Sequence, residues 1–107
     1  MSERIIKMEV KGMILPVTIE IIKKGKWFIA KAVELDFVSQ GRTLEEAKKN
    51  LFEVIEIQFE EMKKLGTLND YLEECGYKVD NNEQLYPEFV GLERVEVAIE
   101  CPQELRP

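Results

Sequence analysis

The segment from Thr43 to Gly66 carries the strongest folding signal in the sequence. Thr43 and Glu46 have the T-x-x-E spacing of a capping box, in which both side chains pair with backbone N–H groups at the start of a helix. Gly66 follows the last apolar position, where a left-handed residue commonly ends a helix. Between these signals, apolar residues recur at helical spacing: Leu44, Ala47, Leu51, Val54, Ile55, Met62 and Leu65. The pattern predicts one helix of about 22 residues, roughly 33 Å long, with an apolar side that requires a sheet to cover it.

Alternating apolar residues before this helix predict an antiparallel sheet. The expected strands are residues 5–10, 14–23, 27–33 and 37–40. In the second strand, Val17, Ile19 and Ile21 face one way. The third strand is apolar on both faces, which is typical of a central strand.

Two further elements are expected after the long helix. Thr67 is a good N-cap for a second helix, and this helix ends near Gly76. Residues 78–88 are polar and are expected to form a loop. From Val95 to Ile99, apolar residues alternate with polar ones and predict a final strand, which must pair with the sheet or with another chain.

These elements give an α+β fold in a single domain of residues 1–107, with an elaboration at about 67–91. The predicted architecture is a two-layer sandwich. Its sheet is mostly antiparallel, in the order β-β-β-(β)-α-α-β, and the long helix covers one face.

The other face of this sheet is expected to be more apolar than solvent usually contacts. It would carry Ile5, Ile22 and either Trp27 with Ile29 or Phe28. We therefore expect a homodimer or a higher homo-oligomer. The candidate self-association residues are Trp27, Ile29, Val95 and Val97.

The net charge of −6 is unevenly spread along the chain. Residues 1–33 carry seven Lys/Arg and three Glu, a balance of +4, and residues 34–107 carry eight Lys/Arg and eighteen Asp/Glu, a balance of −10. An acidic body repels a phosphate backbone, so direct DNA binding is not expected. A basic protein partner would be attracted, although surface acids also serve simply to keep a small domain soluble.

The chain contains no histidine, which removes the commonest general base and the commonest metal ligand. Any catalysis would have to use carboxylates, lysines or tyrosines, and we expect no enzyme activity, no metal and no cofactor. Cys75 and Cys101 do not have metal-ligand spacing, and a disulfide between them is left open. No apolar run is long enough to span a membrane, and the N-terminal residues lack a signal-peptide pattern, so we expect a cytoplasmic protein.

The central block resembles the HicB antitoxin family. The residues that carry the resemblance are Val33-Glu34-Leu35-Asp36, the run from Val38 to Ala47, and Asn50-Leu51. Family members have a similar "P-E-L-x-G…V-S-Q-G-x-T-x-E-E-A…N" sequence, and the match covers roughly residues 14–62. Val33 and Phe37 stand where the family usually has proline and glycine, and no DNA-binding module follows the predicted final strand.

The resemblance implies a partial RNase H-like domain that forms dimers and masks a small basic mRNA-cleaving toxin, HicA. The acidic residues Glu34, Asp36, Glu53, Glu56 and Glu60 are the candidate partner-binding residues. Two simpler interpretations remain open. The helix acids form an ordinary solvated face, and Glu34 and Asp36 accept backbone N–H groups at the corner or stay solvated.

Two other functions are kept as alternatives. One is a stand-alone oligomeric structural or small-ligand-binding protein, with a cavity near Tyr71, Tyr77 and Tyr86. The other is a metal-dependent nuclease that uses Glu34 and Asp36, as RNase H uses converging carboxylates.

Overall fold

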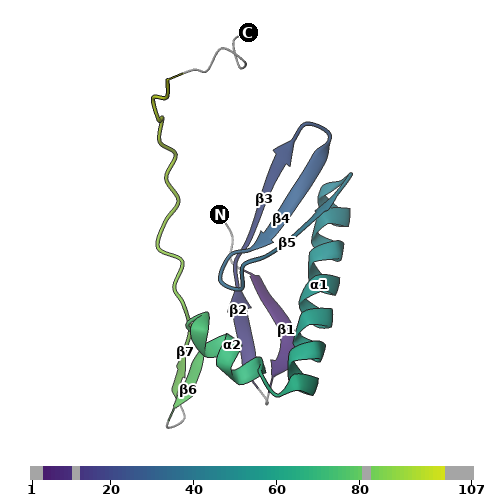
Figure 1. Cartoon of the computed structure of the whole chain (residues 1–107), viewed down its shortest axis with the longest axis vertical. Coiled ribbons are helices and arrows are strands. Elements are labelled where there is room, and N and C mark those ends of the chain that lie inside the picture. Colours follow the sequence, from purple (N-terminus) through teal and green to yellow (C-terminus); the bar gives the residue numbers. More distant parts are fainter. Residues whose placement is uncertain (1–3, 11–12, 81–82, 101–107) are drawn as a thin grey trace.

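Residues 4–10, 13–80 and 83–100 are described by a computed structural model of the chain (Figure 1). The elements in chain order are β1 (Arg4–Val10), β2 (Met13–Val17), β3 (Ile19–Lys24), β4 (Trp27–Ala32), β5 (Phe37–Gly41), α1 (Leu44–Leu65), α2 (Leu68–Glu74), β6 (Lys78–Asp80) and β7 (Glu83–Leu85). The α+β prediction is confirmed: an antiparallel three-stranded sheet packs against the long helix α1, and the short helix α2 follows.

The central sheet has the strand order β3-β4-β5, with β1-β2 and β6-β7 as two separate hairpins. Ala30 lies opposite Ile21 on β3 and opposite Ser39 on β5. Ala30 and Ala32 are fully buried. Because their side chains are small, α1 can pack closely over β4 and β5.

The strand predicted over residues 14–23 divides at Thr18 into β2 and β3. β2 pairs with β1, whereas β3 pairs with β4. Thr18 instead bonds to the corner after β4: its N–H donates to Glu34 Oε1 at 2.7 Å, and its carbonyl accepts from the Val33 N–H at 2.9 Å. The prediction of one continuous strand is therefore wrong at Thr18. At this residue the bonds to Glu34 and Val33 take the place of hydrogen bonds to a neighbouring strand.

The helix α1 has the predicted bounds. Thr43 Oγ1 accepts a hydrogen bond from the Glu46 N–H at 3.0 Å, and Gly66 ends the helix at φ 72°. The Glu46 carboxylate accepts from the Arg42 N–H, one residue before the cap. At Gly41 an added Cβ would lie 2.6 Å from the Ala47 nitrogen, so only glycine lets β5 approach the start of α1 this closely.

The core lies between the sheet, α1 and α2. α1 contributes Ala47, Leu51, Ile55 and Phe59, spaced four residues apart. α2 adds Leu68 and Leu72, and the buried Tyr77 follows it. Neither α1 nor α2, the helices within the described ranges, is long and apolar enough to cross a membrane.

Two expectations for the last third of the chain are corrected. The loop expected over residues 78–88 contains the short hairpin β6-β7. The prediction of a final strand from Val95 to Ile99 is wrong: residues 86–100 adopt neither helix nor strand. They run out from β7 as an extended segment, which we call the arm (Figure 1).

Candidate functional site

Three of the predicted partner-binding residues lie together on one side of α1. Glu53, Glu56 and Glu60 are all exposed, and their spacing of three and four residues places them along one side of the helix. The buried residues Leu51, Ile55 and Phe59 occupy the side that packs on the sheet and hold the helix in place. We call these three carboxylates the acidic stripe.

Asp36 lies at the corner between β4 and β5. Its N–H donates to the Ala32 carbonyl at 2.8 Å, and its φ of 60° puts it in the left-handed region. Aspartate tolerates this conformation better than most non-glycine residues. The side chain is 84% exposed and lies 3.5 Å from Lys31 Nζ. A surface ion pair of this kind contributes about 0–1 kcal/mol, so the carboxylate remains available to solvent or to a partner.

Helix α2 packs beside this corner through Tyr71, and both Asp36 and Glu74 act on the Tyr71 pKa. The Tyr71 ring stacks on Phe37 at 5.7 Å between centroids, and its hydroxyl donates to the Leu35 carbonyl. Burial raises the pKa of Tyr71 to about 12, with smaller contributions from Cys75, Asp36 and Glu74. We call Asp36 and Glu74 the acidic corner. The sequence analysis missed Glu74 because nothing local links two residues so far apart in the chain.

Burial also raises the pKa of the half-buried Cys75 thiol; the neighbouring Tyr71 hydroxyl partly opposes this shift, and Glu74 and Asp36 add to it. Cys101 lies outside the described residues, so a pairing between the two cysteines stays open.

Glu34 does not belong with these exposed acids. Its two carboxylate oxygens each accept a bond of 2.7 Å from Thr18, one from the backbone N–H and one from the hydroxyl. Glu34 accepts a backbone N–H, as the simpler interpretation expected, but this N–H belongs to Thr18, sixteen residues away, and not to the corner itself. For the nuclease alternative, this means that the Glu34 carboxylate is already engaged. Within the described ranges, no three His, Cys, Asp or Glu side chains converge in a way that could hold a metal ion.

The sheet face away from α1 carries Trp27 and Ile29 rather than Phe28. Ile29 lies opposite Ile22 on β3, and Ile22 is 45% exposed. The Trp27 ring lies beside the Arg42 guanidinium, at 4.9 Å from the ring centroid. Phe28 packs against the core instead. Trp27 and Ile29 are therefore on the uncovered face, whereas the other two predicted self-association residues, Val95 and Val97, lie on the arm and are 65% and 75% exposed.

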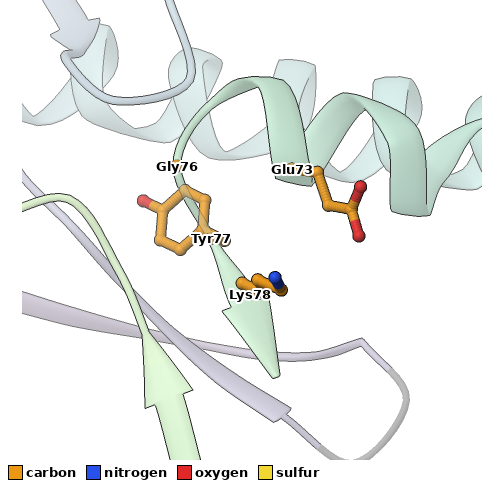
Figure 2. A pocket seen from close by; sticks show the side chains of 4 residues that line it. All are labelled: Glu73, Gly76, Tyr77 and Lys78. Atoms are coloured by element: carbon orange, nitrogen blue, oxygen red, sulfur yellow. The ribbon is translucent and has the colours of Figure 1, made fainter. Parts of the chain in front are cut away.

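A pocket of about 350 Å³ lies after α2 and is lined by Glu73, Gly76, Tyr77 and Lys78 (Figure 2). Figure 2 shows the Tyr77 hydroxyl pointing away from the Glu73 and Lys78 side chains. That hydroxyl donates to the Pro16 carbonyl at 2.7 Å. Of the three tyrosines in the ligand-binding alternative, only Tyr77 lines this pocket, because Tyr71 packs on Phe37 and bonds to Leu35.

Comparison of the chain with protein-family models, with curated proteins and with solved structures found no match. The resemblance to the HicB antitoxins therefore stays a prediction.

Proposed function

We propose that this chain is a non-enzymatic, HicB-like protein-binding domain that masks a small basic ribonuclease. The observation that carries the proposal is the acidic stripe: Glu53, Glu56 and Glu60 project into solvent from a helix held by the core. A row of like charges on a preformed helix suits a cationic protein surface, because the helix backbone loses no conformational freedom on binding.

The acidic corner extends the same chemistry toward α2. Asp36 and Glu74 are exposed and close enough to raise the pKa of Tyr71 together. Glu34 is left out of the proposed surface, since its carboxylate holds Thr18. The proposed partner surface is therefore Asp36, Glu53, Glu56, Glu60 and Glu74.

The test pairs this chain with the short basic protein encoded beside its reading frame. The expected result is a stable complex and loss of the partner's RNA cleavage when the two are mixed. The variant Glu53→Gln/Glu56→Gln/Glu60→Gln should bind at least about tenfold more weakly, as expected when several charge pairs are lost from one interface.

The matched control removes three carboxylates elsewhere: Glu20→Gln/Glu61→Gln/Asp70→Asn changes the net charge by the same amount. It should bind within about threefold of the unaltered chain if the local surface decides affinity. Equal weakening by both variants would assign the effect to net charge alone. Absence of binding, or of a basic neighbouring protein, would refute the proposal.

A further inference from the structure

We propose that two copies of this chain exchange their arms, so that each arm adds a strand to the free edge of β3 in the other copy. This interaction is separate from the acidic surface on α1, and it accounts for two features that the proposed function leaves unused.

The first feature is the arm itself. Val95, Val97 and Ile99 are 65%, 75% and 74% exposed, and they alternate with polar or small residues along an extended backbone. Their spacing puts all three side chains in one row, because successive residues of an extended chain point to opposite sides. Three β-branched residues in such a row are suited to a strand with one covered face.

The second feature is the edge of the central sheet. Among the residues that the structure describes, β3 pairs with β4 alone, and α1 packs over β4 and β5. Ile19 and Ile21 lie at this edge and are only partly buried. An unpaired edge presents free N–H and C=O groups, to which another extended segment can pair.

The arm already lies beside this edge without occupying it. A groove of about 740 Å³ is lined by β3 residues 19–22 on one side and by Leu92, Glu93 and Arg94 on the other. Among the described residues, no backbone hydrogen bond joins the arm to β3. In the described chain, the arm therefore lies beside the edge of β3 without pairing with it.

Charge favours the same pairing. β3 and its turn carry Lys23, Lys24 and Lys26 against the single acid Glu20. The arm carries four glutamates against the single base Arg94, namely Glu88, Glu93, Glu96 and Glu100. In a twofold exchange each arm and each edge is used once, so the assembly closes as a dimer. The row from Val95 to Ile99 would continue the apolar side of β3 formed by Ile19 and Ile21, and Glu96 would share the other face with Ile22.

The first test compares the full chain with Val95→Thr/Val97→Thr by sedimentation equilibrium. Threonine keeps the β-branched shape and the charge but puts a hydroxyl in the apolar row. The dimer dissociation constant should rise at least about tenfold, whereas the control Ala98→Thr, on the opposite row, should change it less than about threefold. A monomeric full chain, or a dimer equally insensitive to both variants, would overturn the proposal.

The second test separates exchange from closure of the arm on its own sheet. In a chain with Cys75→Ser and Cys101→Ser, one preparation carries Ile22→Cys and the other Glu96→Cys. Mixing and oxidising them should give a disulfide-linked pair, and replacing the Glu96→Cys chain with a Glu60→Cys chain should not. A chain carrying both Ile22→Cys and Glu96→Cys should become a covalent dimer. A monomer-sized, internally bridged product would show that each arm closes on its own β3 and would overturn the exchange.

Discussion

Glu34 contributes to the stability of the fold through a single neighbour, Thr18. Thr18 is the one buried polar side chain among those whose burial the structure describes, at 5% exposed, and Glu34 accepts from both its N–H and its hydroxyl. The carboxylate thus compensates for the hydrogen bonds that the strand loses at this position. Asp36, only two residues away, is 84% exposed.

Glu34→Ala should therefore lower the free energy of unfolding by about 2–3 kcal/mol, because it leaves two buried donors of Thr18 without partners. Urea denaturation measures the change. The control Glu61→Ala removes an exposed carboxylate of α1 and should cost no more than about 0.5 kcal/mol. A loss as small as the control's would mean that water satisfies Thr18 in place of Glu34.

Stability should fall at alkaline pH. Burial raises the pKa of Tyr71 to about 12 and raises the pKa of Tyr77 as well, with Glu34 adding to the effect at Tyr77. The unfolded chain releases these protons near pH 10, so between about pH 10 and about pH 12 the unfolded state binds fewer protons and gains relative to the native state. The stabilisation is fully present below the unfolded pKa and is lost as the pH rises.

Urea midpoints at about pH 8 and about pH 11 test this sign, and the absorbance of tyrosinate follows ionisation directly. Tyr77→Phe should show a smaller loss between the two pH values than the unaltered chain. Full ionisation of all tyrosines near pH 10 with the fold intact would contradict the prediction.

Among the elements, α1 is the best specified by local sequence. Thr43 and Gly66 bound it as predicted, with a side-chain bond at one end and a left-handed residue at the other. Thr67 precedes α2 in the same sequence position but makes no side-chain cap bond. The two threonines are therefore a matched pair.

Thr43→Ala should cost about 1 kcal/mol of stability, the usual value for losing an N-cap side chain. Thr67→Ala should cost only a few tenths of that, since no cap bond is removed. Thermal or urea unfolding of both variants measures the difference. Equal losses would mean that tertiary contacts, rather than the cap, set the stability of the start of α1.

The elements also show which parts of the fold can be predicted from sequence. Thr43, Glu46 and Gly66 form their capping hydrogen bonds with residues only a few positions away. The helix and its bounds can therefore be predicted from the local sequence. The break at Thr18 depends on Glu34, sixteen residues away. The apolar alternation of Val17, Ile19 and Ile21 continues across Thr18, so the local sequence does not predict the break. The row from Val95 to Ile99 gave the preference for an extended backbone but not its pairing, because a strand needs a partner that local sequence does not name.

At the candidate site, too, local patterns could be predicted from the sequence and contacts between distant residues could not. The acidic stripe follows from helical spacing alone, and its exposure agrees with the amphipathic pattern. The separation of Glu34 from Asp36 depends on the bonds of Glu34 to Thr18, sixteen residues away in the chain. The approach of Tyr71 to the corner depends on how α2 packs against Leu35 and Phe37.

For the whole molecule, the uneven charge distribution matters most. Residues 1–33 have a balance of +4 and residues 34–107 one of −10, so the protein as a whole carries a net negative charge of −6. The field of this charge acts mainly on the rate of encounter with a charged partner, and salt screens it.

The association rate with the proposed basic partner should therefore fall at least about tenfold between low and high ionic strength, while the dissociation rate changes much less. Stopped-flow measurements at several salt concentrations give both rates. The Glu53→Gln/Glu56→Gln/Glu60→Gln variant should show a shallower dependence. A rate independent of salt would separate the interaction from the acidic surface.

The arm has one more consequence, for how the protein behaves at high concentration. A donor segment that inserts into a neighbour without receiving one in return leaves an empty acceptor at one end and a free donor at the other. Chains joined in that head-to-tail way do not close and grow into filaments. The mutual exchange of arms between two copies therefore prevents the arm from driving polymerisation.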